Sequence, residues 1–447
     1  MRGFVCLLCV LTLCRAYDYK EVLRDSLLFY EAQRSGKLPA DQKVTWRKDS
    51  ALNDKGQKGE DLTGGYYDAG GFVKFGFAMA YTATVLAWGL VDHEGGYTAA
   101  DALHDGRKAV KWATDYFLKA HVSEHELYAQ VGLEKLDCLT WGRPEDMTMD
   151  RTAYKIDKSH PGSELAAETA AALAAASIVF KDVDPSYSSE LLTHAKQLFD
   201  FANNYRGKYS DSIREATPSY VSYTYNDELV WGATWLYRAT GNKSFLRTAE
   251  QLYKEFDLLY MDTGFTWDSK VSGVEVLLAR LTGKPIYKDR VISYCGALAD
   301  SQKRTPKGLV YMDDIGSLRH ISNAAYICLQ LADLGASSDF YRQFSKTQID
   351  YILGDSGRSY VVGFGNNPPT HPRHRASSCP DAPAICDWYT YKSTEPNFHT
   401  LTGALVGGPD SNDNYVDSRE EAVQNMVACD FNAAFQSAVA ALVDLQL

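Results

Sequence analysis

The stretch Leu165-Ala166-Ala167-Glu168-Thr169-Ala170-Ala171-Ala172-Leu173, which continues to Phe180, says most about the fold of this chain. It is rich in alanine, the residue with the highest helix propensity. Apolar side chains cover nearly its whole circumference, whereas a helix at a protein surface keeps one polar face. The stretch therefore predicts a helix that is buried on most of its sides.

Helical periodicity recurs along the rest of the chain, whereas the alternating patterns typical of strands are rare. Loops that carry Gly, Pro, Asn and Asp separate the periodic segments. Because no Pro-, Gly- or Ser-rich linker interrupts them, we expect one large all-α domain over residues 17–447. Besides 165–180, the predicted helical segments are Ala78–Val91, Ala99–Ala120, Glu190–Arg206, Asn226–Thr240, Lys243–Leu258, Val271–Leu281, Ile286–Ser301, Ile321–Leu334, Phe340–Leu353 and Glu420–Leu447.

Residues 1–16 have the order of a secretory signal peptide. Arg2 precedes an apolar run from Phe4 to Leu13, and the small residue Ala16 stands at the predicted cleavage point. We therefore expect a secreted, extracellular protein, a monomer with no membrane or nucleic-acid partner. Removal of the signal takes the formal charge from −11 to −13, because it contains two arginines, and this acidity favours a neutral substrate.

Six of the nine cysteines lie outside the signal, too few for a disulfide-built fold of this length. Cys379 and Cys386 flank two prolines in a polar loop and are the candidate pair. The remaining four lie in apolar helical contexts that are typical of buried free thiols. They are Cys138, Cys295, Cys328 and Cys429.

Several long motifs carry a family resemblance. The segment Gly64-Gly65-Tyr66-Tyr67-Asp68-Ala69-Gly70-Gly71 resembles the aspartate motif of the glycoside hydrolase family nine cellulases. The resemblance covers essentially the whole mature chain and is strongest to the single-domain animal enzymes. Other matching blocks are Val44–Ser50, Trp141–Thr148, Trp267–Gly273 and Gly363–Pro369.

This resemblance implies an (α/α)6 barrel, in which six helical hairpins close into a ring with a substrate cleft at one end. It also implies β-1,4-glucan or a cellooligosaccharide as the ligand, endo-β-1,4-glucanase chemistry with inversion, and no required cofactor. The family often binds a structural calcium ion, and the matching residues here are Asp211 and Glu215.

Two departures from the family pattern concern the chemistry. The family reads Asp-Ala-Gly-Asp, with the general base where this chain has Gly71, and it places the general-acid glutamate where this chain has Met426. Inverting hydrolysis needs two carboxyl groups about 6.5–9.5 Å apart. Glycine offers no proton acceptor and a thioether offers no proton. The resemblance therefore implies a homologue whose catalysis is absent or severely impaired.

Two further departures lie beside these motifs. The family's Pro-His-x-Arg motif reads Pro372-Arg373-His374-Arg375 here, so an arginine replaces the histidine that contacts sugar hydroxyls, and Ala422 replaces an aromatic residue. Without the resemblance, Gly71 would be interpreted as a turn residue and Met426 as a core methionine at helical spacing from its apolar neighbours.

Some family site residues are retained. The resemblance gives Asp68 and Asp417 as the remaining catalytic-motif aspartates, with Asp68 the one credible replacement base. Asp430 would lie one turn from Met426 if that segment were helical, too far to act as the acid directly. The expected sugar-binding residues are Tyr67, Trp141, Arg143, Trp267 and Arg375, with Trp46, Tyr66 and Trp388 as further stacking candidates.

Three hypotheses follow from these observations. The first is a secreted cellulase homologue that has lost catalysis and still binds β-1,4-glucan. The second is an active endoglucanase that uses Asp68 as its base. The third is a secreted protein whose cleft has been repurposed for a role other than catalysis.

Overall fold

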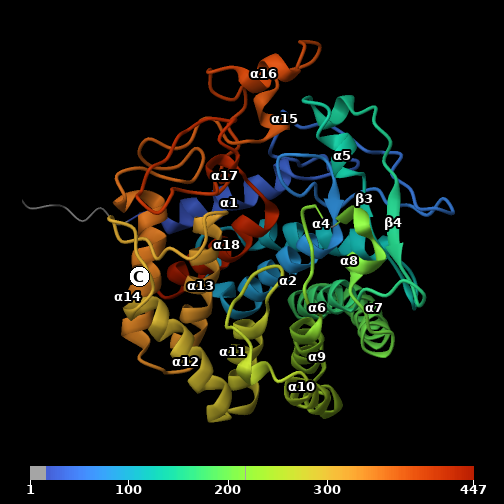
Figure 1. The fold of residues 1–447 in the computed structure, drawn as a ribbon, viewed down its shortest axis with the longest axis vertical. Coiled ribbons are helices and arrows are strands. Elements are labelled where there is room, and N and C mark those ends of the chain that lie inside the picture. Colours follow the sequence, from blue (N-terminus) through green and yellow to red (C-terminus); the bar gives the residue numbers. More distant parts are fainter. Residues whose placement is uncertain (1–16, 217) are drawn as a thin grey trace, which may run out of the picture.

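Six inner helices of the computed structural model, which describes residues 17–216 and 218–447, form a closed ring. Each inner helix packs against the next, and the last one returns to contact the first. Figure 1 shows this ring with the N-terminal helices beside the C-terminal one. The inner helices, in ring order, are α2 (Gly76–Asp92), α6 (Ser163–Phe180), α9 (Asn226–Thr240), α11 (Val271–Thr282), α13 (Ser317–Ala332) and α18 (Cys429–Asp444).

Each inner helix packs against an outer partner, which confirms the predicted (α/α)6 barrel. The outer helices are amphipathic, and one of them buries only Ala249, Leu252 and Tyr253. In the same ring order, the outer helices are α4 (Leu103–Ala120), α7 (Pro185–Asn204), α10 (Lys243–Glu255), α12 (Pro285–Asp300), α14 (Ser338–Asp350) and α1 (Tyr19–Ala32).

The apolar character of the inner helices follows from their enclosure. All residues of α6 from Ser163 to Ser177 are buried, as are all residues of α2 from Gly76 to Leu90. Among the described residues, α6 is long and apolar enough to cross a membrane, but 89% of it is buried within the protein. Its composition is therefore that of a core helix surrounded by other helices.

A small antiparallel sheet, which the sequence did not predict, lies beside the ring. Its central strand β3 (Glu126–Val131) pairs with β1 (Lys74–Phe75), β2 (His121–Ser123) and β4 (Ala153–Ile156). Strands of two to six residues have too few positions to show alternation clearly. The sheet matters because β1 begins three residues after Gly71 and anchors that loop.

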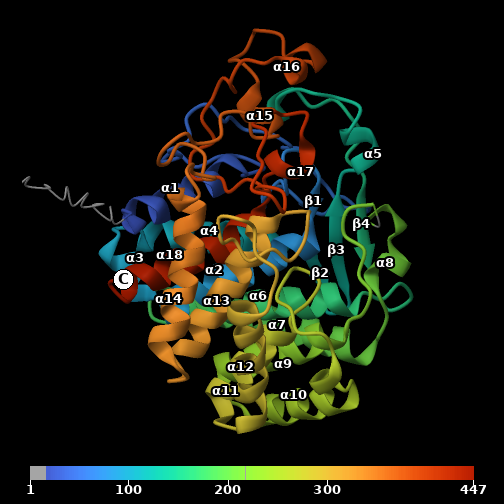
Figure 2. The ribbon, with the colours of Figure 1, turned by 60° about the vertical axis from the view of Figure 1, so that its left-hand side comes forward.

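Short helices gather at one end of the barrel. Figures 1 and 2 both place α5 (Glu134–Asp137), α15 (Arg375–Ser378), α16 (Trp388–Lys392) and α17 (Ala422–Asn425) at this end. The motifs picked out from the sequence therefore come to one end of the ring. The remaining short elements are α3 (Glu94–Ala99), α8 (Tyr209–Ser212), η1 (Pro144–Asp146), η2 (Arg214–Ala216), η3 (Leu258–Tyr260) and η4 (Tyr351–Asp355).

The predicted helix Glu420–Leu447 is wrong at its start. The chain forms α17, leaves the helical conformation, and begins α18 at Cys429. Ala428 has the extended angles φ −152° and ψ 158°, and Met426 has ψ 142°. Met426 therefore lies in a bend between two helices, so arguments from helical spacing around it do not apply.

The cysteine predictions are partly confirmed. Cys379 and Cys386 form a disulfide, as predicted. Cys295 and Cys328 were expected to be free, but they join α12 to α13 through a second disulfide. Cys138 is free as expected but exposed rather than buried. Spacing along the chain could not reveal the second pair, since it depends on which faces of two helices meet. The predicted signal peptide lies outside the described residues.

Candidate active site

Three segments that are far apart in the sequence lie side by side and form the candidate site. They are residues 68–71, 373–375 and 425–429. Backbone hydrogen bonds fix their relative position, so the site is built on main-chain contacts that do not depend on side-chain identity. These bonds run from Arg375 N–H to Gly70 O (3.1 Å), from Arg373 N–H to Asn425 O (2.8 Å) and from Cys429 N–H to Asp68 O (3.2 Å).

Gln33, at the end of α1, holds the first segment in place. Its side-chain amide donates to the carbonyl oxygens of Tyr67, Asp68 and Ala69 at 3.2, 2.9 and 2.8 Å. The side-chain carbonyl of Gln33 lies 2.8 Å from His374 Nε2. Sequence reasoning missed this residue because nothing near position 33 indicates contacts with positions 67–69 or 374.

His374 points into the protein, as expected for a residue one position away from the family's histidine. Its Nδ1 accepts a hydrogen bond from Ser377 N–H, so Nε2 carries the proton and donates to Gln33. Burial, together with the charges of Arg47 and Arg375, lowers the pKa of His374 to about 3. His374 is therefore a neutral structural residue.

Asp68 is buried at the base of the site. Tyr220 donates a hydrogen bond from its hydroxyl to Asp68 Oδ2 at 2.5 Å. Burial, and then the nearby charge of Asp430, raises the pKa of Asp68 to about 7. A carboxyl group with this pKa exchanges protons near neutral pH, which is the range useful for acid–base chemistry. Tyr220 was not predicted, because only folding brings it to Asp68.

Met426 is half-buried, and its backbone forms a bridge with Arg373. Arg373 does not lie free, since its Nη1 donates to the Tyr391 hydroxyl at 2.7 Å and to Arg419 O at 3.0 Å. Gly71 is also half-buried, so both positions border solvent. Neither brings a titratable group to the site.

The Asp430 carboxylate is paired with a residue outside the three segments of the candidate site. It is buried and pairs with Arg319 Nη1 at 3.1 Å, and burial raises its pKa. The helical premise that placed it one turn from Met426 is wrong, because α18 begins only at Cys429. Asp430 therefore acts on the site through its charge, which raises the pKa of Asp68.

Arg375 contacts a carboxylate that the sequence reasoning did not consider. Its Nη1 lies 2.8 Å from Asp137 Oδ2, and both side chains are more than nine-tenths buried. The guanidinium group lies over the rings of Phe72 and Trp141, 5.5 and 5.7 Å from their centroids. Asp137 Oδ1 also accepts the Phe72 N–H at 3.1 Å. This pair brings α5 against the loop that carries Gly71.

Tyr67 does not fit its expected role in stacking on a sugar. It is only 2% exposed, and its hydroxyl donates to Ser50 Oγ at 2.9 Å. The ring packs edge-on against Phe72. Tyr66 is equally buried, and its hydroxyl donates to Ala109 O. Both tyrosines therefore belong to the packing beneath the site.

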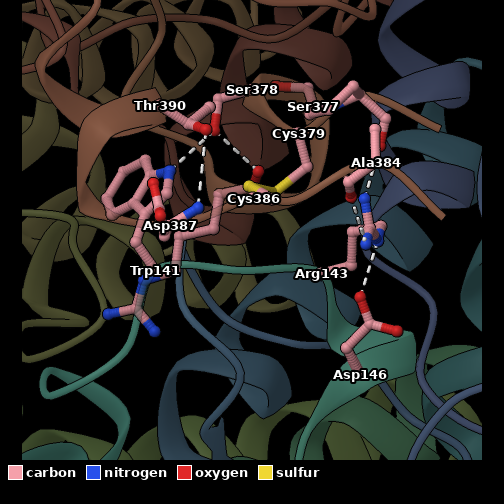
Figure 3. The surroundings of a disulfide bond; sticks show 12 residues. Trp141, Arg143, Asp146, Ser377, Ser378, Cys379, Ala384, Cys386, Asp387 and Thr390 are labelled. Carbon is pink, nitrogen blue, oxygen red and sulfur yellow. Dashed lines mark hydrogen bonds and ion pairs between the residues drawn. A yellow bond between two sulfur atoms is a disulfide. The ribbon is translucent and has the colours of Figure 1, made fainter. Parts of the chain in front are cut away.

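Trp141 and Arg143 hold the disulfide loop, as Figure 3 shows. The Trp141 Nε1–H donates to Ser378 Oγ at 2.9 Å, and its ring packs on Trp388. Arg143 pairs with Asp146 and donates to the carbonyl oxygens of Pro380 and Ala384 at 2.7 and 2.9 Å. The guanidinium of Arg143 is thus committed to the loop, and Trp141 is 5% exposed. The contacts support a structural role for both residues rather than the expected sugar contacts.

Trp267 fits its expected place better. It is half-buried, and its ring lies edge-on to Tyr220 with 4.9 Å between centroids. Tyr220 in turn contacts Asp68.

Trp46 lines a separate cavity of about 640 Å³, together with Arg143, Asp381 and His399. Asp68, Gly71 and Met426 do not line that cavity, so it is distinct from the candidate site.

Asp417 is committed to shaping a loop. It accepts hydrogen bonds from Thr370 N–H, the Thr370 hydroxyl and His371 N–H at 2.8, 2.8 and 3.0 Å. Burial opposes its ionisation, but these bonds outweigh burial and lower its pKa. Asp417 therefore positions residues 370–371, just before Arg373.

Asp211 and Glu215, the residues expected to bind calcium, belong to no cluster of acidic side chains in the described parts of the chain. The Asp211 side chain is 70% exposed and lies 3.4 Å from Lys208 Nζ. Within residues 17–216 and 218–447, no group of three or more His, Cys, Asp or Glu side chains could hold an ion. A Ca²⁺ site normally takes six to eight oxygen ligands. The described residues thus give no support to the calcium prediction.

Comparisons with known proteins agree on one family. The sequence pattern described as "Glycosyl hydrolase family 9" matches residues 19–439. Endoglucanase A of Bacillus pumilus is 45% identical over 448 residues, which cover 96% of this chain and 67% of that protein. The endoglucanase structure from the termite Nasutitermes takasagoensis is 69% identical with a TM-score of 0.96, and the match covers 97% of this chain and all of that one. The cellulase Cel9M of C. cellulolyticum, solved in complex with cellobiose, is 32% identical with a TM-score of 0.90, covering 97% of this chain and all of that one.

Proposed function

This chain belongs to glycosyl hydrolase family 9, and on that premise we propose that it is a secreted protein that binds β-1,4-glucan but hydrolyses it at most very slowly. The observation that carries the proposal is the pair Gly71 and Met426. They stand at the positions that the family resemblance assigns to the general base and the general acid.

Loss of catalysis follows from the chemistry of these two side chains. Cleaving a glycosidic bond by inversion takes one carboxylate to activate water and one carboxylic acid to protonate the leaving oxygen. Each such proton transfer contributes typically about 10²–10⁴-fold to the rate. Met426 has the length of a glutamate but no proton to donate. Without an acid, the sugar leaving group must depart as an unprotonated alkoxide.

Retained binding is supported by the surroundings, which do not depend on the missing groups. Trp267 keeps a half-buried ring beside Tyr220, and Asp68 keeps its carboxyl group. Aromatic faces stack on the apolar faces of sugars, while a few polar groups fix the orientation of a ligand. The C. cellulolyticum cellulase, which shares this fold, was solved with cellobiose.

Two measurements on the purified mature protein test this proposal. The first is hydrolysis of carboxymethylcellulose beside an active family member. Turnover within tenfold of that control would contradict the loss of catalysis and favour the hypothesis that Asp68 replaces the base.

The second measurement is calorimetric titration of cellotetraose into the natural protein and into Trp267→Ala. We expect weak binding in the natural protein and none in the variant. The matched control is Phe340→Ala, because Phe340 is an exposed aromatic residue on the outer helix α14. No heat from the natural protein would show that the barrel is kept only as a scaffold, as the third hypothesis holds.

A further inference from the structure

A carboxylate oxygen from α5 lies in the space beside Gly71. If residue 71 had a Cβ atom, that atom would lie 2.4 Å from Asp137 Oδ2, 3.5 Å from Asp137 Cγ and 3.7 Å from Arg375 Nη1. These contacts come from side chains alone. The vacant position is therefore bordered by one carboxylate and one guanidinium.

The distance of 2.4 Å between this Cβ position and Asp137 Oδ2 can be compared with the geometry of an aspartate side chain. In an aspartate, standard bond lengths and a trigonal carboxyl carbon place each carboxylate oxygen about 2.4 Å from its own Cβ. Asp137 Oδ2 therefore occupies space that a side chain at position 71 would need, and it brings a carboxylate oxygen next to that position. The backbone of Gly71 does not have a positive φ and so admits any residue, but a side chain at position 71 fits only if Asp137 shifts.

Asp137 is held in this place from two sides. Its Oδ1 accepts the N–H of Phe72, the residue that follows Gly71, and its Oδ2 faces Arg375 Nη1 at 2.8 Å. A carboxylate has about four lone-pair positions, so both oxygens can still accept a proton or a water hydrogen. Arg375 Nη1 itself has no hydrogen-bond partner with good geometry. The Asp137 carboxylate can therefore accept a hydrogen from a water molecule that approaches half-buried Gly71 from the solvent side.

We propose that Asp137 has taken over the role of the general base, so that this protein still hydrolyses β-glucosides whose leaving group needs no proton. This inference rests on the proposed function for the binding of the glucosyl chain. It differs from the hypothesis that Asp68 is the base, because Asp68 is buried against Tyr220 beneath the site, whereas Asp137 Oδ2 lies beside Gly71.

Hydrolysis of a β-glycosyl fluoride needs no proton donor at position 426. The oxygen of the water molecule bonds to the anomeric carbon, and the bond from that carbon to a β-fluoride breaks. Fluoride leaves as an anion, so no acid is required. The water proton passes to the Asp137 carboxylate and then to solvent. The products are cellobiose of inverted configuration, fluoride and a proton.

The test measures fluoride release from β-cellobiosyl fluoride. We expect the natural protein to exceed spontaneous release by at least about 10²-fold, and Asp137→Ala to lose that excess. The matched control is Asp92→Asn, which breaks another buried Asp–Arg pair, at the end of α2 away from the site, and should leave the rate unchanged. Release at the spontaneous rate from the natural protein would overturn the proposal.

A double variant that moves the carboxylate from position 137 to position 71 tests whether Asp137 is a base or only supports Arg375. Gly71→Asp in the Asp137→Ala protein returns a carboxylate to the same space from the other side. This double variant should regain fluoride release, whereas Gly71→Asp alone should gain little, because it forces two carboxylates together. A folded double variant that stays at the spontaneous rate would overturn the assignment.

Two further readouts keep this inference apart from the proposed function. Cellotetraose titration of the natural protein tests binding alone, so binding without fluoride release contradicts the inference and leaves the proposed function standing. Asp68→Asn should lower fluoride release less than Asp137→Ala does. The reverse order would identify Asp68 as the base and overturn the role of Asp137.

Discussion

The inner helices of the ring keep a cluster of buried charged side chains, whereas two motif positions of the candidate site carry uncharged residues. Inside the ring, Lys270 Nζ lies 3.1 Å from Glu228 Oε1 and 3.4 Å from Glu168 Oε2, and all three side chains are completely buried. Glu168 also accepts hydrogen bonds from Thr84 and Trp231 at 2.6 and 3.2 Å. At the candidate site, by contrast, Gly71 and Met426 bring no charge at all.

The fold requires the buried charges around Lys270, whereas it does not require a carboxylate at position 71 or 426. Removing one member of a buried ion pair leaves an uncompensated charge in a low dielectric, so the whole fold depends on Lys270 and its partners. Replacing a half-buried catalytic carboxylate with glycine or methionine leaves no such charge behind. A barrel can therefore lose its proton-transfer groups while the backbone bonds between residues 68–71, 373–375 and 425–429 remain.

The largest expected effect is a gain of activity at the site. Met426→Glu returns a proton donor of the same length, and we expect carboxymethylcellulose hydrolysis to rise by about 10²–10⁴-fold. If Asp137 serves as the base, no change at Gly71 is needed for this gain. Met426→Gln is the matched control, because glutamine has the shape of glutamate but no acidic proton. A Met426→Glu protein that binds glucan and shows no gain would mean that the site lacks more than its acid.

The second effect concerns the ring. Lys270→Met leaves Glu168 and Glu228 without their cation, and we expect the free energy of unfolding to fall by about 3–5 kcal/mol. Urea unfolding measures this change. Lys284→Met breaks a surface pair with Glu250 instead and should cost less than about 1 kcal/mol. Equal losses in the two variants would contradict the contrast between the ring and the surface.

The third effect depends on pH and concerns Asp68. Its pKa rises from 3.8 to about 7 on folding, so between these values the folded protein holds a proton that the unfolded chain has released. The stability contributed by this group is therefore complete below pH 4 and is lost as the pH rises to about 7. Asp68→Asn removes the dependence, and it should stabilise the protein by about 1–3 kcal/mol more at pH 8 than at pH 4. Thermal unfolding at both pH values checks this expectation, which fails if the two differences are equal.

The smallest effect compares the two disulfides. The bridge Cys295–Cys328 spans 33 residues within the ring, whereas Cys379–Cys386 spans 7 residues beside the site. Since a longer closed loop restricts the unfolded chain more, replacing the first pair by serine should cost about 1 kcal/mol more than replacing the second. Loss of the second pair should instead weaken cellotetraose binding, because Trp141 is anchored to that loop and supports the Arg375 guanidinium. The reverse pattern in unfolding and titration experiments would contradict both expectations.

Much of the ring was predictable from local patterns. The predicted segment Asn226–Thr240 matches α9, and Val271–Leu281 matches α11 to within one residue. Both helices end at a glycine in the left-handed conformation, Gly241 and Gly283, which is a signal that sequence carries directly. The break before α18 was not predictable in the same way. The apolar pattern continues through it, and the bend at Met426 depends on contacts with Arg373 and Gly407.

The candidate site was predictable as a set of motifs but not as a set of contacts. The motifs identified the segments at Asp68, Arg375 and Met426, and all three meet in the structure. Three residues that decide the chemistry there escaped the sequence, namely Gln33, Asp137 and Tyr220. Each reaches the site across a sequence separation of more than thirty residues. No local pattern records such a contact.

By itself, the amino-acid sequence determined that this chain forms buried helices, that it carries the motifs of a glycan-cleaving family, and that glycine and methionine stand at positions 71 and 426 of those motifs. These are properties of residue type and spacing, which helix propensity and side-chain chemistry translate directly. Only the tertiary structure decided that Tyr67, Trp141 and Arg143 support the site from within and that Asp137 lies beside Gly71. The physical reason is that burial, ion pairing and a raised pKa depend on which distant segments meet, and that meeting is settled only when the ring closes.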